Sequence, residues 1–247
     1  MSKRHDKIGI KQGLRKEWLD QTLNLKLSGL SNKEIRNELI LYMSDKLDNG
    51  SIGIRGKQTT QMAVSMLSKI WINPDNELLN FRNRLLEIAA IDNYLQCHWA
   101  MLSAAYPFWY KVAQQAGRLL NLQEQISKNQ IIQRIKEEYG DRSTVIRSAQ
   151  RVIQGFLAFG VIEESEHKNY YSLSNPIDCN DEMTILLYEA ALYTQKEGRT
   201  ALGLLKNNPA FFPFQLSVLT GDFISQHSNT IDVVRYGLDD ELLKLRN

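Results

Sequence analysis

The chain is 247 residues long and has a formal net charge of +2, with 43% hydrophobic and 23% charged residues, which are ordinary values for a globular protein. This length is sufficient for one large hydrophobic core or two smaller ones. The low net charge excludes a uniformly basic nucleic-acid-binding chain, so any affinity for nucleic acid must come from local patches.

Lysine and arginine are concentrated near the N-terminus. Residues 1–60 contain twelve of them against seven Asp and Glu, residues 61–177 contain twelve against eleven, and residues 178–247 contain six against ten. This asymmetry is typical of a chain that meets DNA with one end.

The cysteine content and the hydropathy pattern indicate where the protein works. Cys97 and Cys179 are the only cysteines, which favours a reducing compartment over a disulfide scaffold. The first residues lack an apolar signal core, and no stretch of about twenty apolar residues occurs in the chain. We therefore expect a cytoplasmic protein that does not enter a membrane.

An N-terminal helical domain is expected over residues 1–105, and its first half has the pattern of a helix-turn-helix. Leucines at helical spacing predict a helix over 14–27. Ser31 and Glu34 form a capping box ahead of a second helix. A third helix is predicted over about 58–71, after the glycine-rich loop KLDNGSIGIRGK.

Basic and hydroxyl side chains gather at the N-terminal end of this third helix, where free backbone N–H groups can also meet phosphate oxygens. We predict DNA contacts there for Arg55, Lys57, Thr59 and Thr60. The alternative is a helical bundle with a solvated basic edge, and the sequence does not separate the two. A nucleotide-binding loop is rejected at Gly56-Lys57, because that motif needs an earlier glycine and a Ser or Thr directly after the lysine.

Another helix is predicted over 78–95, and the segment from Cys97 to Tyr110 is dense in aromatic residues. Aromatic rings can stack on bases, but rings at apolar spacing between helices indicate a core. His98 has no partner at metal-ligand spacing and the other histidines are scattered, so we do not expect a zinc site.

Residues 106–176 have the order of elements of a winged helix-turn-helix. Three segments of helical period are followed by two short strand-like runs around a polar turn. The second helix is predicted to begin at Ser127, and Gly140 supplies a tight corner before the third.

The third helix of this module, over 143–157, has the features of a DNA-reading element. Asp141 or Ser143 is expected to cap it, and Gly160 is expected to end it. One face is apolar, and the other holds Arg, Ser, Thr and Gln without a carboxylate. These side chains provide the donors needed for phosphates and for purine edges in a major groove. The predicted DNA contacts are Arg142, Ser143, Thr144, Arg147, Gln150 and Arg151.

The predicted wing consists of a strand at Val161-Ile162, a polar turn over 165–169 and a second strand that ends at Leu173. Lys168 in the turn is expected to contact the flanking phosphate backbone. Three glutamates near the wing oppose this expectation, because carboxylates repel DNA: Glu163, Glu164 and Glu166. A winged helix that binds only protein, with a merely solvated arginine face, is the alternative.

Residues 177–247 are expected to form a helical segment with a terminal β-hairpin. Helices are predicted over 182–194, 200–205 and 214–225, and strand-like alternation begins at Thr230. Because this part of the chain is acidic, we interpret it as a docking surface for a partner or a second copy.

Catalysis finds little support in the sequence. Asp178, Asp181 and Glu182 could hold Mg²⁺ in a nuclease, but the supporting lysine and strand context are missing. We predict a non-enzymatic protein that carries no cofactor and no metal.

Four stretches of the chain resemble the BrxA-like accessory proteins of bacterial BREX phage-exclusion loci: LSGLSNKEIRNELI, RGKQTTQMAVSMLSKIW, YPFWYKVAQQAGRLLNLQ and DRSTVIRSAQRVIQGFLAFGVI. The resemblance spans residues 14–173 and is one of overall layout. It implies a non-enzymatic DNA-binding protein with helix-turn-helix elements that works beside methyltransferase and ATPase partners in antiphage defence. It assigns no individual residue.

The sequence thus predicts a mainly α protein with a central winged helix-turn-helix and a small β wing, whose third helix enters a major groove of double-stranded DNA. Other defence-system proteins are the expected partners. An isolated module binds non-specific DNA with a Kd of only about 10⁻⁴–10⁻⁶ M at physiological salt, so useful occupancy requires a homo-oligomer, the second basic element or a complex with other proteins. The alternatives are a protein-interaction scaffold and a transcriptional regulator.

Overall fold

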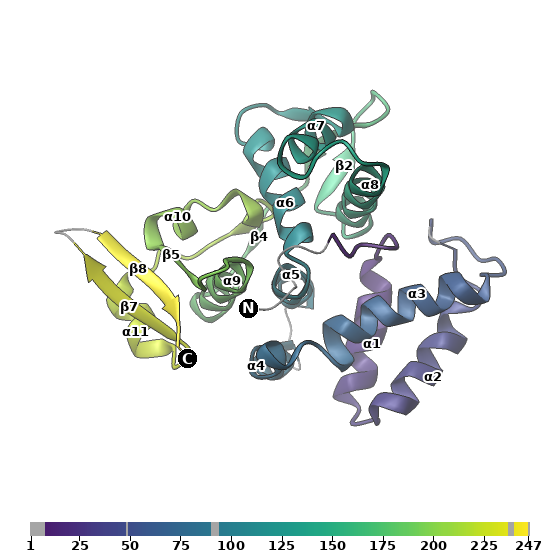
Figure 1. The fold of residues 1–247 in the computed structure, drawn as a ribbon, viewed down its shortest axis with the longest axis horizontal. Coiled ribbons are helices and arrows are strands. Elements are labelled where there is room, and N and C mark those ends of the chain that lie inside the picture. The colour runs from purple at the N-terminus through teal and green to yellow at the C-terminus, as the bar shows by residue number, and fades with distance from the viewer. Residues whose placement is uncertain (1–7, 48, 90–93, 237–239, 247) are drawn as a thin grey trace.

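The computed structural model describes residues 8–47, 49–89, 94–236 and 240–246. The protein is mainly helical, with 59% of the described residues in helices, and its described strands form small sheets of two or three strands (Figure 1). The mainly α fold class predicted from the sequence is therefore confirmed. None of the helices in the described ranges has the length and apolar character needed to cross a membrane.

Three helices form the N-terminal part of the protein. They are α1 (Lys16–Leu27), α2 (Asn32–Met43) and α3 (Lys57–Leu67), and α3 continues into a π-helical turn (Ser68–Ile72). The predicted capping box is present, because the Ser31 hydroxyl accepts from the Glu34 backbone and the Glu34 carboxylate accepts from the Ser31 backbone. Of the three leucines that predict this helix, Leu19 and Leu23 are fully buried, whereas Leu27 is exposed.

Helix α5 (Tyr94–Ala105) runs through the centre of the molecule. It follows a short 3-10 helix (Asn76–Leu78) and α4 (Leu79–Ala89), and it packs against α1, α4, α9 and α6 (Pro107–Leu120). The helix predicted over 78–95 is confirmed as far as Ala89, and its part over 90–93 lies outside the described residues. Every residue from Gln96 to Ala105 is buried, so this helix has no polar surface face.

The aromatic segment is core, as predicted. Trp99 on α5 makes ring contacts with Trp109 on α6 and with three phenylalanines that come from later in the chain. The contacting phenylalanines are Phe156, Phe212 and Phe214.

The central part continues from α6 through β1 (Gln125–Ser127), α7 (Lys128–Tyr139), α8 (Ser143–Ala158), β2 (Ile162–Glu164) and β3 (Tyr170–Leu173). The three strands form an antiparallel sheet in the order β1-β3-β2, in which Tyr171 pairs with both Ile126 and Glu164. The sequence predicts β2 and β3, whereas the short strand β1 was not expected. Gly140 and Gly160 have positive φ angles of 83° and 68°, so each provides the left-handed backbone that ends its helix.

The C-terminal part is built around α9 (Asp181–Thr194), whose side chains from Met183 to Leu192 are all buried. The predicted terminal hairpin is confirmed: β7 (Ile231–Tyr236) pairs with β8 (Asp240–Leu245), and β5 (Arg199–Ala201) adds a third strand. A turn is expected from Gly237 to Asp240; residues 237–239 lie outside the described residues, and Asp240 begins β8. The remaining elements are β4 (Ile177–Asp178), α10 (Leu202–Lys206), a 3-10 helix (Pro209–Phe211), β6 (Phe214–Gln215) and α11 (Gly221–His227).

The helix predicted over 214–225 is wrong in its first half. Phe214 and Gln215 form β6, which pairs in parallel with β4, and the helix begins only at Gly221, where Thr220 caps it. Phe214 is drawn into the aromatic cluster around Trp99, so tertiary packing decides its conformation. The helix predicted over 200–205 likewise begins later, because Thr200 and Ala201 belong to β5.

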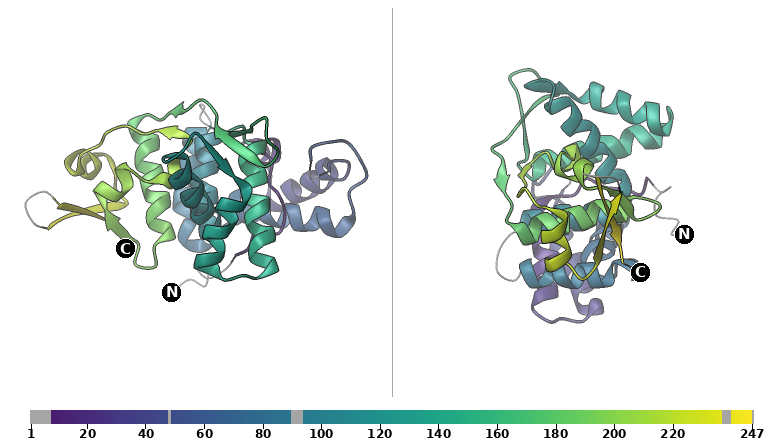
Figure 2. Two further views of the ribbon diagram at one scale, coloured as in Figure 1. Left: turned by 90° about the horizontal axis from the view of Figure 1, so that it is seen from above. Right: turned by 90° about the vertical axis from the view of Figure 1, so that its left-hand side faces the viewer.

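The elements form an elongated molecule. Viewed from above, the N-terminal helices lie at one end, the C-terminal hairpin at the other, and the helices of the central part between them (Figure 2). One contiguous hydrophobic core nevertheless contains residues from all three predicted domains, among them Trp18, Trp109 and Leu187. The ends of the molecule are therefore parts of one packed structure.

Candidate nucleic-acid interface

Helix α8 lies in the central part with one apolar face turned inward. Its buried residues recur at three- and four-residue spacing, which places them on one side of the helix. Phe156 packs between Trp99 and Trp109, and Gly155 lets the Trp109 ring approach, since a Cβ at that position would lie 2.9 Å from it. This packing fixes which face of α8 is exposed.

The N-terminal end of α8 is exposed and has no side-chain cap. Arg142 is the N-cap residue and Ser143 is the first helical residue, so the prediction that Asp141 or Ser143 caps the helix is wrong. The Asp141 carboxylate instead forms an ion pair with Lys136, at 2.8 Å. The N–H groups of an uncapped first turn, together with the helix dipole, favour an anion at this position.

Four of the predicted contact residues surround this end. Arg142, Ser143, Thr144 and Arg147 are all exposed. Ser143 and Thr144 lie four and three residues before Arg147 and therefore share its face of the helix. The Arg147 side chain makes no hydrogen bond or ion pair with any described residue, and Arg142 donates only to the Tyr139 carbonyl, at 3.2 Å. Both guanidinium groups remain available to an external anion.

Two carboxylates close to this surface form ion pairs with lysines of the same chain. Asp141 is paired with Lys136, and Glu138 with Lys111 at 3.2 Å. The exposed arginines at the N-terminal end of α8 therefore face less negative charge than the sequence alone indicates.

The C-terminal half of the same helix face is covered by the N-terminal segment of the chain. The Ser148 hydroxyl and the Arg151 guanidinium both donate to the Ile10 carbonyl, at 3.1 and 3.2 Å. Gly13 lies against Gln154. Arg151 is half-buried and is a structural partner of residues 8–15, so the structure does not support its predicted DNA contact. Gln150 is half-buried at the border of the covered part.

The turn between β2 and β3 bends through Asn169, which has a φ of 66°. Lys168 is exposed there, as predicted. The Glu164 carboxylate accepts a hydrogen bond from the Asn169 backbone, at 2.8 Å, whereas the exposed carboxylates of Glu163 and Glu166 form no hydrogen bond or ion pair with any described residue. Two of the three glutamates therefore keep a negative charge that opposes a phosphate contact by this turn.

The four DNA-contact residues predicted near the start of α3 do not all lie on the surface. Lys57 is exposed in the first turn of α3 and Thr59 is half-buried, but Thr60 is 3% exposed and Arg55 is 6% exposed. The Arg55 guanidinium donates to the Lys46 carbonyl at 2.8 Å and lies over the Trp18 ring. The structure therefore does not support the predicted DNA contacts of Arg55 and Thr60, because both side chains are buried and Arg55 holds the preceding loop.

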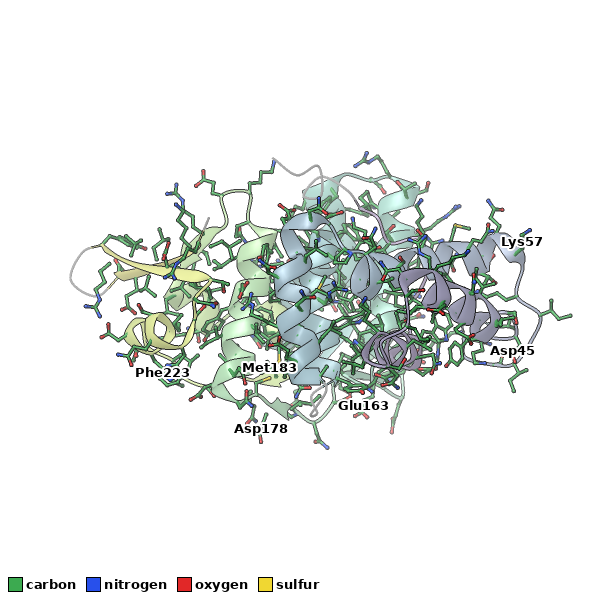
Figure 3. All side chains as sticks on the ribbon, turned by 90° about the horizontal axis from the view of Figure 1, so that it is seen from below. Asp45, Lys57, Glu163, Asp178, Met183 and Phe223 are labelled. Atoms are coloured by element: carbon green, nitrogen blue, oxygen red, sulfur yellow. The ribbon has the colours of Figure 1, made fainter. Side chains whose placement is uncertain are left out.

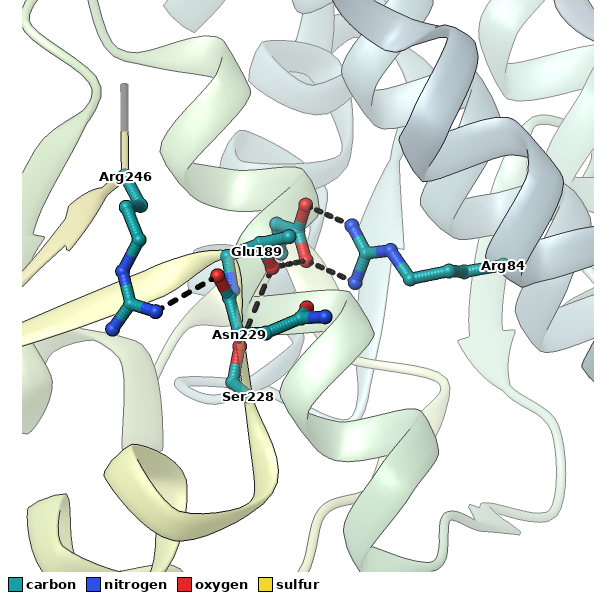
Figure 4. Close-up of polar contacts among 6 residues, drawn as sticks. Arg84, Glu189, Ser228, Asn229 and Arg246 are labelled. Atoms are coloured by element: carbon teal, nitrogen blue, oxygen red, sulfur yellow. Dashed lines mark hydrogen bonds and ion pairs between the residues drawn. The ribbon is translucent and has the colours of Figure 1, made fainter.

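A second concave region, which the sequence did not indicate, lies between α4, α9 and α11. It is a cleft of about 730 Å³. Next to it lies the fully buried Glu189 carboxylate. It accepts hydrogen bonds from both terminal nitrogens of Arg84 and from the Thr230 hydroxyl (Figure 4). Arg246 donates to the Asn229 carbonyl at the same place. These contacts join α4 and α9 to the C-terminal strands.

His98 is a buried structural residue. Its Nδ1 accepts from the Trp71 indole at 3.0 Å, and its Nε2 lies 2.9 Å from the Asp20 carboxylate, so the ring is neutral with its proton on Nε2. Burial lowers the pKa of His98, an effect that Asp20 opposes in part. Within the described ranges, no group of three or more His, Cys, Asp or Glu side chains is arranged to hold a metal ion.

Comparison of the chain with protein-family models, with curated proteins and with solved structures gives no match.

Proposed function

We propose that the protein binds double-stranded DNA through the N-terminal half of α8. The observation that carries the proposal is the pair of exposed arginines, Arg142 and Arg147, at a helix end that lacks a side-chain cap. Neither arginine forms an ion pair within the described residues, while the neighbouring Asp141 is neutralised by Lys136. This surface offers an anion two unpaired cations and free backbone donors.

The order and pairing of the elements around α8 support the proposal. Helices α6, α7 and α8 are followed by a β2–β3 hairpin that pairs with β1, which is the element order of a winged helix-turn-helix. We infer that α8 is its recognition helix. In such modules the N-terminal residues of the recognition helix contact base edges, and these are the residues that the N-terminal segment leaves uncovered.

Within this proposal the residues have distinct roles. Arg147, and Gln150 at the edge of the covered part, read base edges in the major groove, where arginine binds guanine and glutamine binds adenine. Arg142, Ser143 and Thr144 bind phosphates and thereby fix the orientation of the helix. Lys168 contacts the flanking backbone.

The resemblance to BrxA-like proteins supports a non-enzymatic accessory role in antiphage defence, beside other proteins of the same locus. The competing function is a scaffold whose central module docks on protein. The exposed Glu163 and Glu166 favour the scaffold, because they place negative charge on the wing. The two functions differ in their response to salt and to loss of the arginines.

The test compares a variant carrying Arg142→Ala and Arg147→Ala with the wild type, by fluorescence anisotropy on a duplex of about thirty base pairs. Over a salt series, each lost phosphate contact lowers the slope of log K against log salt by about 0.9. We expect the variant to bind at least about tenfold more weakly, with a shallower slope.

The matched control carries Arg199→Ala and Arg235→Ala, because it removes the same charge from two exposed arginines of the C-terminal sheet. It should bind nearly as well as the wild type. Equal weakening of both variants would mean that net charge, and not α8, determines affinity. No binding by the wild type at low salt would favour the scaffold.

A further inference from the structure

The loop between α2 and α3 carries an exposed apolar tip. Ile52 is 86% exposed and Ile54 is 97% exposed, and both are in the part of the chain with the basic balance. They are two residues apart, on either side of Gly53, and both side chains are exposed at the same point of the loop. Lys57 follows them, exposed and without an ion pair to any described residue. We call Ile52, Ile54 and Lys57 the tip.

The tip is held in a defined conformation. Two backbone hydrogen bonds cross the loop. The Gly53 N–H donates to the Asp45 carbonyl at 2.8 Å, and the Arg55 N–H donates to the Ser44 carbonyl at 2.9 Å. The Arg55 guanidinium closes the base of the loop over Trp18. Residues 53–55, held by these contacts, lose little conformational entropy on binding, which favours association.

The cleft between α4, α9 and α11 has the complementary character. Its apolar side chains include Ile88, Ile185, Leu186 and Phe223. Its rim carries Glu87, Asp181 and Glu182, whose exposed carboxylates make no hydrogen bond or ion pair with any described residue. We call this cleft the socket.

Both arginines that line the socket form ion pairs with carboxylates of the same chain, so they do not offset the negative charge of its rim. Arg84 is paired with the buried Glu189 (Figure 4). Arg246 is paired with Asp232 at 2.7 Å. The three rim carboxylates therefore leave the socket with an uncompensated negative charge. Such a site favours an occupant with apolar side chains next to a cation.

The tip and the socket lie at opposite ends of the molecule. Viewed from below, Lys57 and Asp45 mark one end and Phe223 is near the other (Figure 3). A copy of this chain therefore cannot fill its own socket. A contact between different surfaces of two copies is heterologous, and it continues into an open row when the ends point apart.

We propose that the tip of one copy occupies the socket of a second copy. Ile52 and Ile54 pack on the apolar floor, and Lys57 pairs with the rim carboxylates Asp181 and Glu182. Copies joined in this way form a head-to-tail row. This contact needs no DNA, so its test is independent of the DNA binding proposed for α8.

The test is sedimentation velocity on the full chain over a concentration series without DNA. One variant carries Ile52→Asp and Ile54→Asp in the tip, and another carries Asp181→Lys and Glu182→Lys in the socket. We expect the average mass of the wild type to rise with concentration beyond a dimer. Each variant alone should associate at least about tenfold more weakly. Leu122→Asp, at another exposed apolar position, should behave as the wild type.

Mixing the two variants gives the decisive outcome. The tip variant keeps an intact socket and the socket variant keeps an intact tip, so an equimolar mixture should form a dimer and nothing larger. Circular dichroism checks that both variants are folded. A wild type that stays monomeric, a wild type that stops at a dimer, or a mixture that does not associate would each overturn the proposal.

Discussion

Buried polar residues show how single side chains hold this protein together. Glu189 has no exposed surface, and its carboxylate is satisfied by Arg84 and Thr230. His98 is likewise buried between Trp71 and Asp20. Although burial raises the pKa of Asp20, hydrogen bonds from His98 and Lys16 bring that pKa below its ordinary value. Each of these side chains joins elements that are distant in the sequence.

The lowered pKa of His98 predicts a loss of stability in mild acid. Below the ordinary histidine pKa of about 6.5 the unfolded chain takes up a proton that the folded chain excludes, so folding becomes less favourable as the pH falls. Between pH 7.5 and 5.5 the free energy of unfolding should therefore decrease, by up to about 1.4 kcal/mol for each pH unit below that pKa.

Urea denaturation at each pH measures this dependence. The control is His98→Gln, which removes the titrating ring and should flatten the dependence while lowering stability at every pH. The Asp20 contribution is lost only at lower pH, because its folded pKa is below the ordinary value of about 3.9. Identical pH dependence in the two proteins would exclude His98 as the cause.

At the scale of elements, two helices can approach each other closely where one of them has a glycine, because glycine has no side chain at the contact. On α6, a Cβ at Gly117 would lie 1.9 Å from the Pro209 carbonyl oxygen, so the 3-10 helix Pro209–Phe211 rests directly on α6. The helix pattern over 107–120 gives no indication of this contact.

We expect Gly117→Ala to destabilise the protein by about 1–3 kcal/mol, because the added methyl group forces α6 and the 3-10 helix apart. Gly203→Ala on α10 is the matched control, since a Cβ there meets nothing within 4 Å. That change should be neutral or stabilising by about 0.4–1 kcal/mol. Thermal denaturation of both variants tests the difference, and similar melting temperatures would contradict the close contact.

At the scale of the whole molecule, the central module shares its core with the rest of the chain. Trp109 and Phe156 belong to residues 106–176, but their rings pack with Trp99 before that range and Phe212 after it. The N-terminal segment also binds α8 through the Ile10 carbonyl. The position of the exposed arginines therefore depends on parts of the chain outside the module.

We expect a fragment of residues 106–176 to lack a cooperative unfolding transition, because its excision exposes these aromatic rings and α6. Circular dichroism melting of the fragment beside the full chain tests this, with the full chain as the control. A fragment that melts cooperatively near the temperature of the full chain would show that the module is independent.

The local features of this protein could be read from its sequence because they depend on neighbouring residues. Helical periodicity placed α1, α7, α8 and α9, the Ser31–Glu34 capping box is present, and Gly160 ends α8 as predicted. Alternation of side chains likewise gave the terminal hairpin. Capping, periodicity and positive φ angles need only a few consecutive residues.

The candidate site was predictable only in part, because exposure depends on residues far away in the chain. Arg142 and Arg147 are exposed and form no ion pair with a described residue, whereas Arg151 donates to the Ile10 carbonyl and Arg55 lies over the Trp18 ring. All four are arginines in polar surroundings, so no local pattern distinguishes them. The socket depends on Arg84 and Glu189, which are 105 residues apart. The sequence determined the helices and their polar faces, and the tertiary structure decided which of those faces remain open, because burial is set by long-range packing.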